Sequence, residues 1–275
     1  MAASTPASPT TKKRSAAKLG ARFEGKVALI TGASEQGIGG AVAERLLEEG
    51  ASVCLMSRSE PAGLLEKHAG DDKESRAQWI KCDLAQADTI GPAVEAAVQA
   101  FGSLDVLVNN SGIDTSGAFA DLKDEEWQQM LDVNLSGAIR VTQAAMPALL
   151  KSKGSVVNVA SATAMGGTPG LAAYSATKAG MVGFTQSLAA EVAPRRVRVN
   201  AVCPAIVKTP MTTQYAQQLN AETWQQLQAC HPMGIGKPAD VAAAVAFLAS
   251  SDARWITGIA LPLGWMSSFS MPMAE

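Results

Sequence analysis

The chain has 275 residues, of which 47% are hydrophobic and 17% charged, and its formal net charge is −2. This length is enough for one large domain with a sizeable core. The near-neutral balance gives no electrostatic reason to expect nucleic acid or an anionic membrane as a partner, and no apolar run reaches the roughly 20 residues of a membrane-spanning helix.

Residues 1–22 differ in composition from the rest of the chain. They are rich in Ala, Ser, Thr and Pro, contain five basic residues and lack acidic ones. Such a segment is typical of a disordered tail, and its composition is also similar to that of an organellar transit peptide. We expect a basic tail at 1–22, with organellar import as the alternative, and one folded domain over 23–275.

Short apolar runs then alternate with longer segments of helical periodicity. The runs predict strands at 26–31, 52–57, 77–83, 104–110, 154–161, 197–203 and 258–263. The intervening segments predict helices, among them 39–50, 123–151 with a kink near Pro147, 172–193 and 238–250. Strands this apolar need cover on both faces, and regular alternation gives parallel strands with right-handed crossovers. The sequence therefore predicts an α/β fold, a single-domain doubly wound (Rossmann) parallel sheet in a three-layer αβα arrangement, whose ligand lies at the carboxyl ends of the strands.

A glycine-rich turn, TGASEQGIG at 31–39, joins the first strand to the first helix. Its glycines permit a sharp turn and the close approach of a pyrophosphate to the helix N-terminus. Four residues separate Gly32 from Gly37, one more than expected for such a turn. No Gly-Lys-Ser/Thr follows, which excludes a P-loop. The residues of this turn that we expect to contact a dinucleotide are Gly32, Ser34, Gln36, Gly37, Ile38 and Gly39.

The second strand ends in Ser57 and Arg58, where this topology places the adenosine ribose of a dinucleotide. An acid at this point would bind the free 2′-hydroxyl, whereas an arginine pairs with a 2′-phosphate. Glu35 in the turn argues the other way, and a solvated surface arginine is the alternative interpretation of Arg58. The sequence therefore favours NADP(H), with NAD(H) as the alternative.

A set of four residues, Asn134, Ser161, Tyr174 and Lys178, predicts acid–base chemistry. Tyr174 and Lys178 lie four apart on a predicted helix and so share a face, Ser161 ends the fifth strand, and Asn134 lies in the long preceding helix. A free tyrosine has a pKa of about 10, and a nearby ammonium group lowers that pKa by stabilising tyrosinate. Each residue alone has an ordinary structural interpretation, as a surface pair or a turn cap. Together, beside a cofactor turn, they predict a proton-transfer site.

These motifs resemble those of the short-chain dehydrogenase/reductase family, over residues 26–264. The matching motifs are the turn 31–39, Asp83–Leu84, NNSG at 109–112, Asn134, Ser161, YSATK at 174–178 and CPAIVKTPM at 203–211. The resemblance implies an NADP(H)-dependent oxidoreductase that transfers a hydride between nicotinamide and a carbonyl or secondary alcohol, similar to the 3-oxoacyl-carrier-protein reductases and so a ketoreductase. The chain departs from the family pattern at Ser111, where alanine is usual, and at Ala205, where glycine is usual.

The resemblance also implies a role for each site residue. Tyr174 would be the general acid/base, and Ser161 would orient the carbonyl. Lys178 would lower the tyrosine pKa and bind the ribose, and Asn134 would hold a proton-relay water. The further residues implied to bind the cofactor are Asp83, Leu84, Asn110, Ser111, Gly112, Pro204, Val207 and Thr209.

The substrate is expected to be a small molecule whose identity stays open. Carrier-protein reductases commonly place basic residues on two long helices, and the corresponding positions here are Pro147 and Ala190, which weakens an acyl-carrier substrate. The apolar residues expected to close over the substrate from the region 205–235 are Met211, Tyr215, Leu219, Trp224 and Met233. The family usually forms homotetramers, and the Met-rich residues 266–275 are expected at a subunit interface.

The four cysteines form no CxxC pair, and the two histidines, His68 and His231, lie far apart and are expected to be surface or core residues. We therefore expect reduced thiols in a cytoplasmic compartment and no metal site. Two other functions stay open, an NAD-dependent alcohol dehydrogenase of the same fold and a non-catalytic NADP(H)-binding regulator. No Gly-x-Ser-x-Gly turn surrounds Ser161, which excludes a hydrolase of that type.

Overall fold

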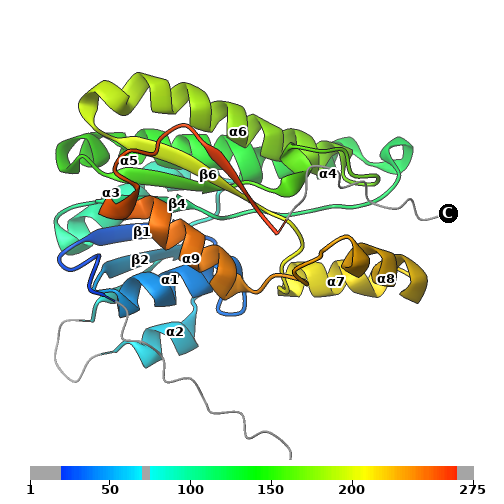
Figure 1. Cartoon of the computed structure of the whole chain (residues 1–275). Coiled ribbons are helices and arrows are strands. Elements are labelled where there is room, and N and C mark those ends of the chain that lie inside the picture. Colours follow the sequence, from blue (N-terminus) through cyan, green and yellow to red (C-terminus); the bar gives the residue numbers. More distant parts are fainter. Residues whose placement is uncertain (1–19, 70–74, 265–275) are drawn as a thin grey trace, which may run out of the picture.

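Seven parallel strands form one sheet in the computed structural model, which describes residues 20–69 and 75–264 (Figure 1). In chain order the strands are β1 (Val27–Thr31), β2 (Ser52–Ser57), β3 (Ala77–Lys81), β4 (Val106–Asn109), β5 (Ser155–Val159), β6 (Arg198–Pro204) and β7 (Ala260–Leu263). Their order across the sheet is β3-β2-β1-β4-β5-β6-β7. The direction of winding reverses between β1 and β4, and the predicted doubly wound sheet is confirmed.

Helices cover both faces of this sheet and form the outer layers of the predicted αβα arrangement (Figure 1). The α-helices are α1 (Ile38–Glu48), α2 (Ala62–Lys67), α3 (Ala87–Phe101), α4 (Asp124–Leu131), α5 (Ala138–Ser152), α6 (Ala172–Val192), α7 (Pro210–Gln218), α8 (Ala221–Ala229) and α9 (Pro238–Ala249). On one face α1 and α9 pack over Ala28 and Ile30 of β1. On the other face α3, α5 and α6 cover Val27 and Leu29. Side chains alternate along a strand, so the four apolar residues of β1 enter one core or the other, which explains its continuous apolar run.

A chain of buried polar side chains ties β4 and β5 to the helices beside them. Asn109 Nδ2 donates hydrogen bonds to Asn158 Oδ1 and to Thr142 Oγ1, each at 2.8 Å. Asn158 Nδ2 donates in turn to Thr185 Oγ1 at 2.8 Å. All four side chains are buried. Because Thr142 belongs to α5 and Thr185 to α6, these bonds fix both helices to the strand ends at which the site lies.

The helix predicted over 123–151 is three segments in the structure. A π-helical segment, Asp132–Gly137, separates α4 from α5. The irregularity therefore lies upstream of the predicted position, because Pro147 sits inside the α-helical part of α5. Single π-helical turns are rare and frequently occur at functional sites, and this one contains Asn134.

Arg22, the last residue of the expected basic tail, is bound to the folded domain. Its guanidinium donates to Glu49 Oε1 at 2.7 Å and to Asp252 Oδ2 at 3.1 Å, and Glu49 is fully buried. Arg45 also pairs with Glu49 from one turn earlier in α1. The fold thus reaches at least to Arg22, whereas residues 1–19 and the Met-rich segment 266–275 lie outside the described residues.

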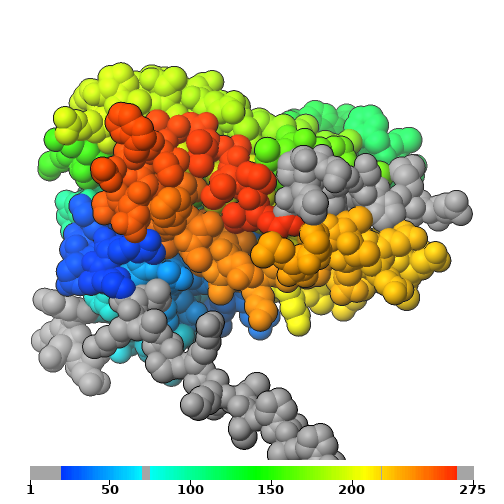
Figure 2. Space-filling model, in the orientation of Figure 1, coloured from blue at the N-terminus to red at the C-terminus, as the bar shows by residue number. Residues whose placement is uncertain are grey.

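The helices α7 and α8 project beyond the carboxyl ends of the strands, as both the ribbon and the space-filling view show (Figure 1, Figure 2). None of the helices described is both long enough and apolar enough to span a bilayer. All four cysteines are free, and within 20–69 and 75–264 no three His, Cys, Asp or Glu side chains are grouped to hold a metal ion.

Candidate active site

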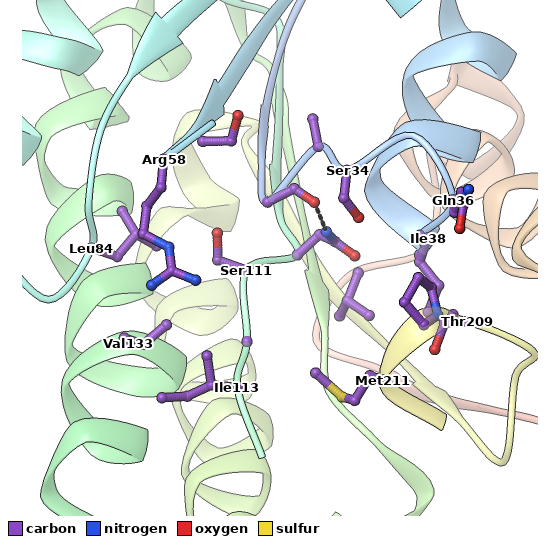
Figure 3. Close-up of a pocket in the computed structure, with 18 of the residues that line it drawn as sticks. Ser34, Gln36, Ile38, Arg58, Leu84, Ser111, Ile113, Val133, Thr209 and Met211 are labelled. Atoms are coloured by element: carbon purple, nitrogen blue, oxygen red, sulfur yellow. Dashed lines mark hydrogen bonds between the residues drawn. The ribbon is translucent and has the colours of Figure 1, made fainter. Parts of the chain in front are cut away.

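A cleft of about 710 Å³ opens at the carboxyl ends of β1 and β4, where the winding reverses (Figure 3). Its volume lies in the range of about 300–1,000 Å³ that is typical of small-molecule sites. The structure places every residue expected to bind the cofactor in the lining of this cleft, except Gly39. The lining residues among them are Gly32, Ser34, Gln36, Gly37, Ile38, Ser57, Arg58, Asp83, Leu84, Asn110, Ser111, Gly112, Tyr174, Lys178, Pro204, Val207 and Thr209.

The glycine-rich turn is locked to the end of β4. Gly32 has φ +69°, and a Cβ there would lie 2.8 Å from the Cα of Ser111, so only glycine fits. Asn110 Nδ2 donates to the carbonyl oxygens of Thr31 and Gly32 at 3.0 and 2.9 Å. Thr31 Oγ1 accepts from the backbone N–H groups of Asn110 and Ser111, each at 3.0 Å. The two strand ends that border the cleft therefore hold one another in place.

The extra residue of the turn is accommodated by a glycine that follows the motif. The backbone N–H of Gly40 donates to Ser34 O at 3.2 Å. A Cβ on residue 40 would lie 2.4 Å from Ser34 O and 2.9 Å from Glu35 O. Gly39 is similarly enclosed, since its Cβ would lie 2.4 Å from Gly32 O, which explains why it stands behind the lining rather than in it. The longer loop thus lies directly on the first turn of α1.

The N-terminus of α1 faces the cleft without a capping side chain. Gly37 is the N-cap residue, and no side chain accepts a hydrogen bond from the first turn. The first N–H groups of a helix have no intrahelical partner and carry a partial positive charge, so they are suited to bind a phosphate. This arrangement fits the predicted pyrophosphate site of a dinucleotide.

Arg58, which favours NADP(H), and Glu35, which argues against it, both line the cleft. Glu35 Oε1 accepts a hydrogen bond of 2.7 Å from the backbone N–H of Gly63, in the first turn of α2. The guanidinium of Arg58 points into the cleft beside Leu84 (Figure 3). Within the described part of the chain it has no hydrogen bond or ion pair. The acid is thus engaged with the protein backbone, whereas the arginine presents its full set of donors to the cleft.

Tyr174 and Lys178 share the cleft-facing side of α6, as their spacing predicts. Lys178 is 3% exposed, and its Nζ donates to Val159 O at 3.0 Å. The same Nζ lies 5.6 Å from the centroid of the Tyr174 ring. Ser161 follows β5, and its Oγ accepts hydrogen bonds from Thr163 N and Thr163 Oγ1 at 3.2 and 3.0 Å. Because both Thr163 groups donate to Ser161, the hydroxyl proton of Ser161 is left to point elsewhere.

Burial dominates the titration of this pair. It raises the pKa of Tyr174, the charge of Asp114 raises it further, and only a hydrogen bond with Ser161 opposes these effects. Burial lowers the pKa of Lys178 to about 8, opposed by Cys203 and Asp114. The expectation that the tyrosine pKa is lowered is therefore not met in this structure, because removal from water disfavours tyrosinate more strongly than the neighbouring groups favour it.

Asn134 stands behind the cleft and does not line it. It is fully buried in the π-helical segment. Its Oδ1 accepts from the N–H of Ile113 at 2.8 Å, and its Nδ2 donates to Ile113 O at 2.9 Å and to Thr177 Oγ1 at 3.2 Å. The side chain therefore holds the chain after β4 against α6, and is not itself directed at a ligand in the cleft.

A second, smaller cavity of about 120 Å³ adjoins the cleft. Ser161 and Tyr174 line both spaces, so the two hydroxyls stand where a cofactor cleft meets a substrate-sized cavity. Of the apolar residues expected to cover a substrate, Met211 and Tyr215 line the small cavity. The others, Leu219, Trp224 and Met233, do not line it, and Met233 is 93% exposed.

Two residues of the small cavity were not expected from the sequence. Asp114 lies two residues after the NNSG motif and lines the cavity. His231 is buried there, and its Nε2 accepts a hydrogen bond of 3.2 Å from the N–H of Ile206. Asp114 had a signal, an acid beside a motif at a strand end, whereas the partner of His231 is backbone and leaves no mark in the sequence.

Comparisons with known proteins identify relatives of this chain. Residues 32–263 match a family model described as enoyl-(acyl carrier protein) reductase. A 3-oxoacyl-[acyl-carrier-protein] reductase of Thermotoga maritima is 39% identical over 246 residues, which is 86% of this chain and 95% of that protein. A solved 3-ketoacyl-(acyl-carrier-protein) reductase of Brucella melitensis complexed with NADH is 36% identical, with a TM-score of 0.77 over 88% of this chain and 97% of that one. The ligand-free aldohexose dehydrogenase of Thermoplasma acidophilum is 34% identical, with a TM-score of 0.80 over 93% and 99% of the two chains.

Proposed function

The chain belongs to the short-chain dehydrogenase/reductase family of oxidoreductases, and from this premise we propose that it is an NADP(H)-dependent ketoreductase that interconverts a carbonyl and a secondary alcohol. One observation carries the proposal. The hydroxyls of Ser161 and Tyr174 lie at the junction between the cleft of about 710 Å³ and the cavity of about 120 Å³, with the Lys178 ammonium behind the phenol. A substrate oxygen placed at this junction meets two hydroxyl donors at once.

Each of these side chains has a distinct task in reduction. Tyr174 donates its phenolic proton to the substrate oxygen, and its raised pKa keeps that proton in place near neutral pH. Ser161, whose Oγ already accepts from Thr163, donates its own proton to the same oxygen and orients it. Lys178 places a positive charge beside the ring, which stabilises the tyrosinate that forms as the proton leaves.

Asn134 acts through position in this scheme. Its side chain is fully used in bonds to Ile113 and Thr177, so we assign to it the task of holding the floor of the site. A proton-relay water at Asn134, which the family resemblance implies, is compatible with the π-helical segment because a π-turn leaves backbone carbonyls without their usual helical partners. Tyr174 must regain a proton after each reduction, and Lys178, which is only 3% exposed, would need such a route from solvent to pass one to it.

The cleft supports a dinucleotide held at three places. The uncapped N-terminus of α1 would hold the pyrophosphate, Arg58 a 2′-phosphate, and Val207 with Thr209 the nicotinamide amide group. The bound cofactor supplies the hydride, and the protein supplies position and electrostatics. Because Glu35 is engaged with Gly63, its charge opposes NADP(H) less than a free carboxylate would. The Brucella melitensis relative is complexed with NADH, so NAD(H) stays the alternative that the assay includes.

The relatives suggest two kinds of substrate, acyl thioesters on a carrier protein and aldohexoses. Pro147 and Ala190, which occupy the positions expected to receive an acidic carrier, are exposed and uncharged, and this favours a free small molecule. The family resemblance further supports a homotetramer in a cytoplasmic compartment. Light scattering on the purified protein and localisation of the full chain test these two points.

The proposal is tested with the variant Tyr174→Phe, which removes one oxygen atom. Wild type is expected to oxidise NADPH, followed by its near-ultraviolet absorbance, with at least one compound from a panel of ketones, aldoses and acyl thioesters. The variant should lose at least about 100-fold in kcat, the lower end of the contribution of a general acid, while its affinity for NADPH measured by fluorescence stays within about twofold. Normal turnover by the variant, or binding of NADPH by wild type without any turnover, would contradict the proposal; the second result would point to a regulator.

A further inference from the structure

Asp114 is the one charged residue that lines the small cavity without lining the cofactor cleft, within the described part of the chain. It follows Ile113, whose backbone is fixed on both sides by the amide of Asn134. The carboxylate is therefore presented from a rigid support to the space beyond Ser161 and Tyr174, on the substrate side of the reacting centre.

The carboxylate lacks a partner where one is needed. Its Oδ1 is buried, and no group of the described residues donates a hydrogen bond to it. Buried polar atoms nearly always have a hydrogen-bond partner, and a buried carboxylate oxygen without one is unfavourable by several kcal/mol in the most apolar surroundings. A carboxylate that lines a cavity at an active site and has an oxygen without a partner is suited to receive a donor from the substrate.

The charges around Asp114 restrict what this donor can be. The Lys178 cation opposes the effect of burial, which raises the pKa of Asp114, and the Asp114 charge acts in turn on Tyr174 and Tyr215. Because Lys178 already supplies a positive charge near the carboxylate, a second cation in the cavity would be repelled by it. A neutral hydroxyl meets no such repulsion, and it can donate to a carboxylate or accept from a carboxylic acid, so it suits Asp114 in either protonation state.

We propose that Asp114 is a specificity-determining residue that binds a hydroxyl group of the substrate other than the reacting one. This inference rests on the proposed function and names its substrate class, which is small polyhydroxylated carbonyl compounds such as hydroxy ketones and sugars. An alkyl chain in the same place would bury the carboxylate without a donor, and the cavity of about 120 Å³ limits the size of what enters. A hydroxyl group placed beside the reacting carbonyl, in a molecule small enough for the cavity, therefore decides whether a substrate is accepted.

The test uses three ketones that differ in a single substituent: hydroxyacetone, aminoacetone and acetone. Their reduction by wild type is compared with that by Asp114→Asn, which keeps the shape, and Asp114→Leu, which removes the acceptor. Asp121→Leu, the same change at an exposed acid outside both spaces, is the matched control. NADPH affinity is measured for each variant, because Asp114 does not line the cofactor cleft and a folded variant should bind the cofactor normally.

Wild type should prefer hydroxyacetone over acetone by about 10- to 100-fold in kcat/KM, the size of a hydrogen bond to a charged group. In Asp114→Leu this preference should disappear, with hydroxyacetone slower and acetone faster than in wild type, and Asp114→Asn should lie between. Asp121→Leu should keep the wild-type preference. If Asp114→Leu has lost NADPH affinity, Asp114→Asn decides.

The following results would overturn the inference. If wild type prefers aminoacetone, Asp114 binds an ammonium group of the substrate and not a hydroxyl. Reduction of all three ketones with equal efficiency, or a preference that survives in Asp114→Leu, would remove Asp114 from specificity and leave the proposed ketoreductase standing. A wild type that reduces none of the three ketones but reduces an acyl thioester through Tyr174 would do the same, whereas turnover independent of Tyr174 would remove the proposed function as well.

Discussion

Replacement of Arg58 by alanine is the sharpest test of cofactor preference, because this side chain points into the cleft and has no partner within the described residues. The substitution removes the forked donor set and leaves the backbone after β2 unchanged. NADPH and NADH differ only in the 2′-phosphate, so the loss of a phosphate contact should fall on one cofactor alone.

The magnitude follows from the exposure of the side chain. A hydrogen bond to a charged group contributes about 1.5–3 kcal/mol. Arg58 is exposed, so solvent screens it, and the lower part of this range applies, roughly 1.5–2 kcal/mol. Since about 1.4 kcal/mol corresponds to a tenfold change, kcat/KM for NADPH should fall roughly 10- to 30-fold in Arg58→Ala, while kcat/KM for NADH should change less than about twofold.

The assay is steady-state kinetics with both cofactors at a fixed, saturating substrate concentration. Lys81→Ala is the control, since it removes a neighbouring exposed positive charge at the end of β3 that does not line the cleft. The wild-type advantage for NADPH should also shrink as salt is added, because exposed charges are screened. An equal loss with both cofactors in Arg58→Ala, or a wild type that uses NADH better, would refute the reasoning.

Three further predictions concern the charged and crowded positions of the fold. Burial lowers the pKa of Lys178 to about 8, so its ammonium is present below that pH and lost above it, and kcat/KM for reduction should fall as pH rises through about 8; a profile flat well above this value would contradict the role given to Lys178. Burial raises the pKa of Glu49, but hydrogen bonds from Arg22 and Arg45 outweigh it and lower this pKa below its ordinary value. The ionised Glu49 side chain therefore stabilises the fold at pH values above its pKa in the unfolded chain. This stabilisation is lost as pH falls through the pKa of Glu49 in the folded protein. Urea unfolding should therefore show Glu49→Gln to be destabilised by roughly 1–3 kcal/mol near neutral pH, with the gap to wild type closing in acid, and Glu44→Gln, in an exposed pair, by less than about 0.5 kcal/mol. Gly112→Ala would bring a methyl group within 3.3 Å of Lys178 Nζ. It should raise the KM for the cofactor by about tenfold, with a smaller relative change in the free energy of unfolding measured in urea.

The sequence was sufficient for the sheet because its strands are buried on both faces. Each appears as a short run of β-branched and apolar residues, and the structure confirms all seven with boundaries within a few residues. The same holds for the pairing of Tyr174 with Lys178, since helical periodicity alone brings residues four apart onto one face.

Other features depend on contacts that periodicity does not encode. The π-helical segment at Asp132–Gly137 changes which carbonyl each N–H group bonds to without changing the apolar pattern of the sequence. The irregularity was therefore predicted near Pro147, which was wrong, because Pro147 lies inside the α-helix α5. The direction of the Tyr174 pKa shift depends on how deeply the folded chain buries the phenol, which the sequence pattern does not encode. Asp114 acquires its importance only when the segment after β5 and the helix α7 close a cavity around it.

The contact between the long glycine-rich turn and Gly40 also makes the length of the turn and the identity of residue 40 depend on each other. A glycine inside a helix is unfavourable by only about 1 kcal/mol relative to alanine. With the turn at its present length, a methyl group at position 40 would lie 2.4 Å from Ser34 O, a backbone atom that no side-chain rotation can move away. A larger residue at position 40 therefore requires the turn to shift or shorten, so the two features cannot be changed independently.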